Sequence, residues 1–245
     1  MRRLASALPI LALALLCAST GYAADAEAGA KHTLSLLDLI IAGGVVMLLL
    51  VILSITTFSL ALNWTFTIKR DTLIPPGMAD DIHNALAEGV SDEAFENARN
   101  VVANDTSMLG NILAAAFDKK DFGYNAMKES AEAVGIGEHN KYTAKVAWLS
   151  MFASSATLLG LLGTVSGIIG SFLKMASNPG GVDPNVLAEN IGEALTCTAA
   201  GLAIAIGGLY FFFFLRARVN QAAIDAAIIA QEILDYFRPQ GDQHH

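Results

Sequence analysis

Three long runs of apolar residues divide the chain, and each is long enough to cross a membrane. They cover residues 39–68, 146–173 and 186–215, and the first two contain no charged side chain. A helix rises about 1.5 Å per residue, so about 20 apolar residues span the roughly 30 Å hydrocarbon core of a bilayer. The pattern predicts an all-α membrane protein with three transmembrane helices.

The polar segment 69–145 separates the first two runs and predicts a helical loop in the cytoplasm. Pro75-Pro76 breaks the first helix, and we expect three or four short amphipathic helices after it. Ser91 precedes an acidic turn, as a helix N-cap does, and residues 105–107 offer a second cap. The apolar face of the helix after this second cap consists of Leu109, Ile112 and Phe117.

Two further segments complete the expected topology. Residues 174–185 form a short periplasmic loop, in which Pro179-Gly180-Gly181 is a turn signal. After residue 215 no helix breaker occurs before Pro239. Residues 216–245 therefore predict a cytoplasmic C-terminal helix and tail, so that long helices extend from the membrane into the cytoplasm.

Residues 1–23 have the pattern of a signal peptide. Two arginines come first, then an apolar stretch, then small residues up to Ala23. The apolar stretch is shorter than a membrane span requires, so we expect cleavage after Ala23 or Ala24. An uncleaved first membrane helix is the alternative. Residues 24–38 are expected to form a periplasmic N-terminus.

Basic residues beside the spans indicate how the chain is oriented. Lys31 and Lys174 flank one side, whereas a larger set flanks the other. Because Lys and Arg are enriched in cytoplasmic flanks, the larger set marks the cytoplasm of a bacterial inner membrane. The N-terminus is then periplasmic and the C-terminus cytoplasmic. The larger set is Lys69, Arg70, Lys141, Lys145, Arg216 and Arg218.

The composition supports a membrane protein and argues against several other classes. Hydrophobic residues make up 54% of the chain and charged residues only 16%, with a formal net charge of −8. An acidic chain is a poor partner for nucleic acid. Cys17 and Cys197 lack metal-ligand spacing, and no nucleophile–base pair or phosphate-binding loop is visible. We therefore expect no cofactor, no metal and no enzymatic activity.

Small side chains recur every three or four residues along one face of the second and third runs. Two compatible interpretations follow: such residues let helices pack closely, and hydroxyls from several subunits can line a narrow ion pathway. The second run's stripe is Ser150, Ala153, Thr157, Gly160, Thr164, Gly167 and Ser171. The third run's stripe is Ala194, Thr198, Gly201, Ala205 and Gly208. The opposite faces are bulky, with Leu158, Leu162, Val165, Phe172, Ile204, Ile206, Leu209 and Phe211 to Phe214.

Glu193 is the candidate site residue with the most unusual position. It lies within the third apolar run, about two turns from the loop. A carboxylate at membrane depth is costly, so we expect it to face protein or water and to serve function. The alternative is a residue near the interface that is solvated or that caps the start of the helix, as expected for Glu189. A proton relay needs a titratable group near the membrane centre, and Thr164 and Thr198 do not titrate, so a partner helix is expected to supply a carboxylate.

Two segments of the sequence resemble signatures of the ExbB/TolQ/MotA proton-channel family. Residues 159–168, Leu-Gly-Leu-Leu-Gly-Thr-Val-Ser-Gly-Ile, are similar to the signature of its second helix. Residues 191–206, which begin Ile-Gly-Glu-Ala-Leu-Thr-Cys-Thr, are similar to that of its third helix. The resemblance covers residues 36–238. It departs from the family at Thr157 and Gly207, where members often have proline.

The resemblance implies a homo-oligomer, a pentamer around a central pore, in the lipid bilayer. The pore would hold helices of an ExbD/TolR-like partner whose aspartate carries the proton, and a TonB-like protein would receive the work. The implied ion pathway comprises Thr157, Thr164, Glu193 and Thr198. The implied packing or pore-lining residues are Gly160, Gly163, Gly167 and Gly201.

Three functions remain open from the sequence. The chain is closer to ExbB and TolQ than to MotA, which has four spans, and its N-terminal extension favours an ExbB-like motor subunit that energises TonB-dependent outer-membrane transport. A TolQ-like subunit for envelope integrity is the alternative within the family. A membrane scaffold that conducts nothing is the alternative outside it. The sequence does not separate proton from sodium.

Overall fold

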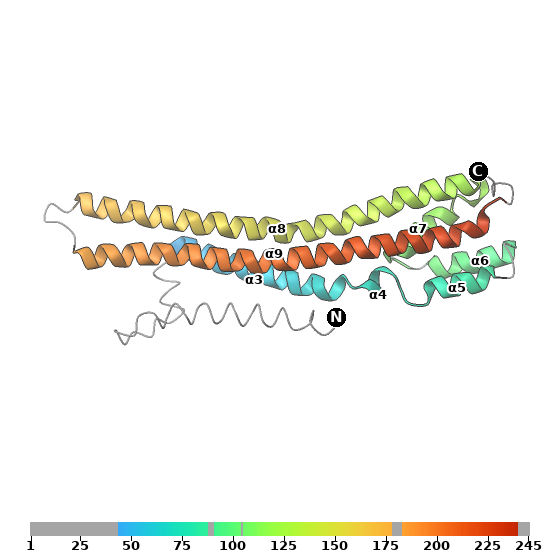
Figure 1. The fold of residues 1–245 in the computed structure, drawn as a ribbon, viewed down its shortest axis with the longest axis horizontal. Coiled ribbons are helices and arrows are strands. Elements are labelled where there is room, and N and C mark those ends of the chain that lie inside the picture. Colours follow the sequence, from blue (N-terminus) through green and yellow to red (C-terminus); the bar gives the residue numbers. More distant parts are fainter. Residues whose placement is uncertain (1–43, 88–90, 104, 178–182, 240–245) are drawn as a thin grey trace. The chain divides into compact units, whose positions relative to one another are not determined.

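The computed structural model describes residues 44–87, 91–103, 105–177 and 183–239, and these form helices joined by short turns (Figure 1). Three of the helices are long and apolar enough to cross a membrane: α3 (Gly44–Thr67), α8 (Tyr124–Ser177) and α9 (Pro184–Leu234). The all-α membrane fold expected from the sequence is confirmed. The expected signal peptide and periplasmic N-terminus, residues 1–38, lie outside the described residues.

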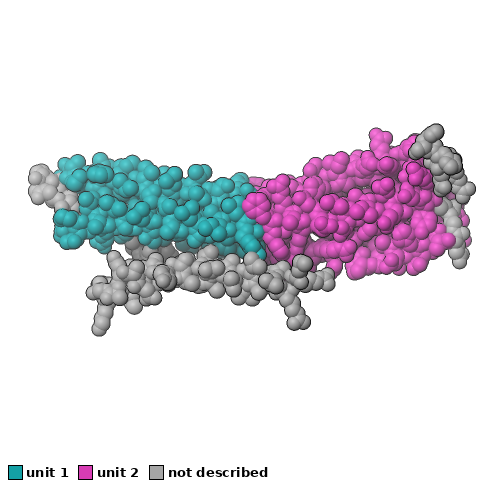
Figure 2. All heavy atoms as spheres, viewed as in Figure 1, with its two compact units in different colours: residues 1–60, 149–211 teal, residues 61–148, 212–245 magenta. Residues whose placement is uncertain are grey.

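The chain divides into two compact units, which Figure 2 distinguishes by colour. Unit 1 contains residues up to 60 together with residues 149–211, and unit 2 contains residues 61–148 and 212–245. Both α8 and α9 contribute residues to each unit. Within each unit these two helices run antiparallel beside one another (Figure 1).

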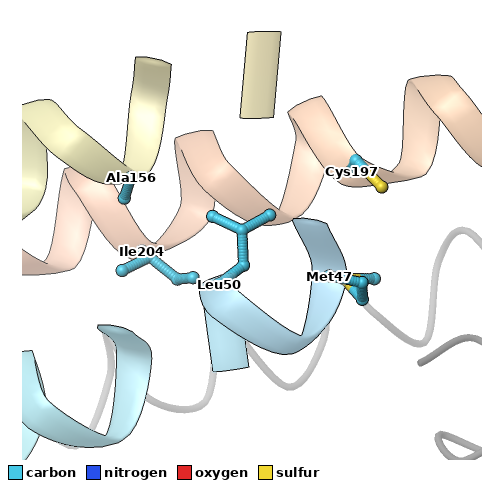
Figure 3. Packing of buried hydrophobic residues seen from close by; sticks show 5 residues of the cluster. All are labelled: Met47, Leu50, Ala156, Cys197 and Ile204. Atoms are coloured by element: carbon cyan, nitrogen blue, oxygen red, sulfur yellow. The ribbon is translucent and has the colours of Figure 1, made fainter. Parts of the chain in front are cut away.

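Unit 1 is built from three apolar helices, with α3 packed against the pair formed by α8 and α9. Its core joins side chains from all three helices (Figure 3). Leu50 of α3 is 1% exposed and Ala156 of α8 is fully buried. This core consists of Met47, Leu50, Ala156, Cys197 and Ile204.

In unit 2 several short helices pack beside the extensions of α8 and α9. The short elements are α4 (Arg70–Leu73), α5 (Met78–Leu86), α6 (Asp92–Val102), α7 (Met108–Phe117) and the 3₁₀ turn η1 (Lys120–Phe122). The predicted N-cap Ser91 accepts a hydrogen bond from the Ala94 N–H. Ser107 likewise accepts one from the Gly110 N–H, which identifies the capping residue within 105–107. The predicted apolar face of α7 is buried.

Aromatic contacts join the end of α9 to the short helices. The 3₁₀ turn η2 (Asp235–Phe237) follows α9, and its Phe237 ring lies 5.9 Å from the Phe95 ring and 6.1 Å from the Phe117 ring. Lys120 Nζ lies 4.0 Å from the centre of the Phe95 ring. The predicted C-terminal extension of the third helix is therefore present and anchored.

Some helix boundaries differ from those expected. The first helix ends at Thr67, before Pro75-Pro76, and the short α4 intervenes. The break falls at Lys69, whose backbone is extended (φ −105°, ψ 154°), ahead of the prolines. The helix that contains the second span begins at Tyr124, since no proline separates that residue from the apolar run. The same helix continues to Ser177, so Lys174 is helical rather than part of the loop.

Candidate ion-pathway and helix-contact site

The small residues of the two stripes face each other between α8 and α9. A methyl group added at Gly160 would lie 3.1 Å from both the Cys197 carbonyl oxygen and the Thr198 Cα. One added at Gly201 would lie 2.5 Å from the Ala156 carbonyl oxygen. The distance at Gly201 is too short for a real side chain, and those at Gly160 are tight contacts with backbone atoms, so glycine at both positions allows the two backbones to approach this closely.

The same kind of contact recurs at regular intervals along the pair. A methyl at Gly167 would lie 2.6 Å from the Ala194 Cβ, and one at Gly208 would lie 3.1 Å from the Ala153 Cβ. Each helix thus presents a small residue every seven positions, the spacing that keeps one seam facing its neighbour. The packing interpretation of the stripes holds within the chain. This small-residue set, spaced by seven positions along each helix, is Ala153, Gly160 and Gly167 on α8, with Ala194, Gly201 and Gly208 on α9.

Thr164 and Thr198 carry two of the hydroxyls of the stripes, and that of Thr198 lies in this contact region. Thr164 is buried, and its Oγ1 donates to the Leu161 carbonyl at 2.7 Å. Thr198 is half-buried, and its Oγ1 donates across to the Gly160 carbonyl of α8 at 2.8 Å. A hydroxyl that donates in this way still has lone pairs that can accept from water or coordinate a cation. Thr157 differs from both, because it is exposed on α8.

Helix α3 adds contacts that the sequence pattern did not reveal. A methyl at Gly163 would lie 3.3 Å from Val46 Cγ1 and 2.7 Å from the Cys197 Cβ. Thr57 is fully buried, its Oγ1 donates to the Leu53 carbonyl at 2.7 Å, and its methyl faces Gly208. The hydroxyl of Thr57 within an apolar run was the one sequence signal for a contact of α3. Nothing in the sequence indicates which neighbour this residue meets.

Glu193 lies on α9 one turn before Cys197, and its side chain is half-buried. Glu189, one turn nearer the loop, is exposed, in line with the solvated position expected for it. Lys174 donates a hydrogen bond to Asn190 Oδ1 at 3.2 Å, which ties the end of α8 to the start of α9 near these acids. The described residues place Glu193 in the same unit as both threonines.

The bulky faces are only partly as expected. Leu158, Val165 and Ile206 are exposed, as expected for residues that face lipid or a partner. Ile204 and Phe211 are instead buried, at 7% and 8% exposure, because α3 covers that side of α9. The Phe211 ring packs edge-on against the Phe58 ring of α3, with 6.4 Å between centres. Sequence periodicity identified two faces but could not place the third helix.

These features define a class of helical membrane protein. It has three spans, long helices that extend beyond them, and a seam of paired small residues with two inward hydroxyls. The sequence model of the MotA/TolQ/ExbB proton channel family matches residues 104–226. The chain belongs to this family.

Known relatives agree with this assignment. The chain is 35% identical to "Biopolymer transport protein exbB1" of Vibrio cholerae over 115 residues, 46% of this chain and 47% of that protein. It is 30% identical to "Putative biopolymer transport protein ExbB-like 1" of Synechocystis over 206 residues, 82% of this chain and 79% of that protein. It is 27% identical to "Biopolymer transport protein ExbB" of Xanthomonas campestris over 166 residues, 65% and 63% of the two chains. An ExbB type of function is therefore supported.

Proposed function

We propose that the chain is an ExbB-like subunit of an inner-membrane motor driven by the proton-motive force, and that this motor energises TonB-dependent outer-membrane transport. The observation that carries the proposal is the Thr198 hydroxyl at the α8–α9 seam, which is bonded to the Gly160 carbonyl at 2.8 Å, together with the buried hydroxyl of Thr164 on α8. Family membership gives these residues an ion-channel context.

Each residue has a distinct part in this proposal. Thr157, Thr164 and Thr198 offer oxygen atoms that bind water weakly, as a narrow pathway requires. Glu193 is the group of the chain that can exchange a proton at membrane depth. An ExbD/TolR-like partner contributes a membrane aspartate, and a TonB-like protein takes up the mechanical output. The chain is homo-oligomeric, a pentamer, with its N-terminus periplasmic and its C-terminus cytoplasmic.

Proton flux through reconstituted complexes tests the pathway. Vesicles would contain the full chain with an ExbD-like protein that carries the aspartate, and a pH-sensitive dye would report flux under an imposed gradient. Thr164→Val together with Thr198→Val removes both hydroxyls and is expected to reduce partner-dependent flux to the level of the partner-free control. Thr164→Ser with Thr198→Ser keeps the hydroxyls and is expected to conduct. Equal flux in both double variants would contradict the pathway.

A scaffold that conducts nothing is the second candidate, and the backbone contact at Gly160 and Gly201 favours it, because packing alone accounts for the seam. The two candidate functions predict different effects of a substitution at Glu193, because this residue does not belong to the small-residue set. Glu193→Gln removes the charge at nearly constant volume and is expected to abolish uptake that an uncoupler also abolishes. An unchanged, uncoupler-insensitive activity in this variant would favour the scaffold.

A further inference from the structure

A hollow of about 680 Å³ lies between α8 and α9 in unit 2, and His139 lines one end of it. At the far end the Tyr124 hydroxyl donates to Asp235 Oδ1 at 3.0 Å. Ile136 and Ile224 also line the hollow and are 64% and 56% exposed, so it opens to the surface of the chain. The hollow lies beyond the basic flanks of the spans, on the side expected to be cytoplasmic. Water can therefore reach His139.

The imidazole of His139 is held at one nitrogen and open at the other. Its Nε2 lies 2.9 Å from Asn220 Oδ1 on α9 and 3.4 Å from Thr143 Oγ1 on α8. Because the amide oxygen accepts, Nε2 carries the proton of the neutral ring, and Nδ1 has the lone pair. Nδ1 has no hydrogen-bond partner among the residues that the structure describes. The half-buried ring can therefore take a proton at Nδ1 without losing its contact with α9.

Thr143, which contacts this ring, is the first of a row of hydroxyls along α8. Seven residues of a helix rise about 10.5 Å, so water has to connect one hydroxyl of the row with the next. The row includes two threonines of the proposed ion pathway, and His139 lies one turn beyond its cytoplasmic end. Its members recur every seven positions of this continuous helix, at Thr143, Ser150, Thr157, Thr164 and Ser171.

The other titratable groups around His139 keep their charge state near neutral pH. Carboxyl, phenol, amino and guanidinium groups ordinarily change charge far from pH 7, whereas imidazole does so between about pH 5 and pH 8. Helix α7 contributes only the apolar Ile112 to the hollow. The ion pairs are Glu138 with Lys141 and Lys128 with Glu132 on α8, and Asp225 of α9 with Arg70 of α4. The remaining groups are the phenols of Tyr124 and Tyr142 and the basic flank residues Arg216 and Arg218.

We propose that His139 is the proton-accepting residue on the cytoplasmic side of the ion pathway. A proton that leaves the pathway through water adds to Nδ1 and gives the imidazolium ion, which stays bound to Asn220 through its Nε2–H. The ion then loses a proton from Nδ1 to water or buffer in the hollow, and the neutral ring is restored. No other bond changes. This inference rests on the proposed function and adds the residue through which protons leave the chain.

Proton flux in weakly buffered vesicles tests this role. The vesicles would contain the full chain with the ExbD-like protein, and a pH-sensitive dye would report flux. His139→Gln keeps a polar side chain that cannot titrate. It is expected to lower flux about tenfold, which is less than the full contribution of a positioned proton-transfer group because water replaces part of it. Imidazole added on the cytoplasmic side is expected to restore flux, since it carries protons in place of the missing ring.

His83→Gln is the matched control within unit 2. His83 lies on α5, where its Nδ1 is 3.1 Å from the Tyr236 hydroxyl, and its variant should conduct like the wild-type chain with and without imidazole. Equal flux in His139→Gln and His83→Gln would contradict the proposal. A reduced flux that imidazole does not restore would assign His139 a purely structural part and would also contradict it. Absence of partner-dependent flux in the wild-type complex would instead contradict the proposed function, and this inference with it.

A second variant keeps the histidine and does not depend on the folding of His139→Gln. Asn220→Asp places a carboxylate beside Nε2, where the amide oxygen now lies at 2.9 Å, and so favours the imidazolium ion. The pH dependence of flux should move upward by about one pH unit. The shift should be absent when His139→Gln is combined with it. No shift in the single variant, or the same shift in the combined one, would show that His139 does not carry the proton.

Discussion

Units 1 and 2 use the same two helices and the same kind of small residue, with opposite results. In unit 1 a methyl at Gly201 would lie 3.1 Å from the Gly160 Cα, so the backbones are in contact. In unit 2 a methyl at Gly135 would meet only the Ile112 side chain, at 3.6 Å, and a hollow remains between the helices.

The difference comes from the third element in each unit. In unit 1 α3 packs over the pair from outside, with Val46 on Gly163 and Thr57 on Gly208. In unit 2 Ile112 of α7 lines the hollow beside Gly135, and side-chain ends such as His139 and Asn220 connect the two helices. Small residues therefore permit close approach but do not enforce it.

Replacement of a glycine by alanine should change the stability of the chain in opposite directions in the two units. This is the largest expected effect. Gly201→Ala places its methyl against backbone, which cannot move aside, and should destabilise the chain by about 1–3 kcal/mol. Gly135→Ala meets only ordinary contact and gains helix propensity, so it should stabilise by about 0.5 kcal/mol. Unfolding in mixed detergent micelles, followed by circular dichroism, measures both.

Gly192→Ala is the matched control in α9, since a methyl there meets nothing within 4 Å. It shares the propensity gain of the other two variants. If Gly201→Ala behaves like Gly192→Ala, the close contact is not present in the folded chain in micelles, and the distinction between the seam and the hollow disappears.

Loss of the hydroxyl that bridges the seam should have a smaller effect. Thr198→Val keeps the shape but removes the donor to the Gly160 carbonyl, and should cost about 1 kcal/mol in the same unfolding assay. Thr198→Ser keeps the donor and should lie near wild type. A stable Thr198→Val chain with lost conduction would mean that the hydroxyl serves the ion pathway and not the packing.

The smallest effect is expected at the far end of the hollow. Tyr124→Phe removes the hydrogen bond to Asp235 and should cost at most about 0.5 kcal/mol, because the contact is exposed. Burial, followed by that hydrogen bond, raises the pKa of Tyr124 above its ordinary value of 10.0. The folded chain holds this proton more tightly, so its contribution is complete below pH 10 and declines as the pH rises through the raised pKa.

Unfolding measured from pH 8 to pH 11 tests this pH dependence. The wild-type chain should lose slightly more stability over this range than Tyr124→Phe. Parallel curves would show that the Tyr124 hydroxyl does not contribute to the contact between α8 and η2.

Most of the fold could be predicted from the lengths of the apolar runs. The three spans, the cap at Ser91 and the extension of the third helix were predictable, because each depends on local properties of neighbouring residues. The early start of α8 at Tyr124 was not predicted, since a polar amphipathic helix and a polar loop differ little in composition. Of the candidate site, Gly160, Thr198 and Gly201 come together as one contact region and Thr164 is buried on α8, while Thr157 lies exposed and the pore itself stays a prediction.

The sequence by itself determined that this protein is helical, that it spans a membrane and that two of its helices carry small, hydroxyl-bearing stripes. These features depend on length, periodicity and the high cost of polar groups in lipid. Only the tertiary structure decided that the stripes meet in unit 1, that a hollow remains between the same two helices in unit 2, and that α3 buries Ile204 and Phe211. Which face a third helix covers depends on contacts between residues far apart in the chain, and periodicity along one helix contains no information about them.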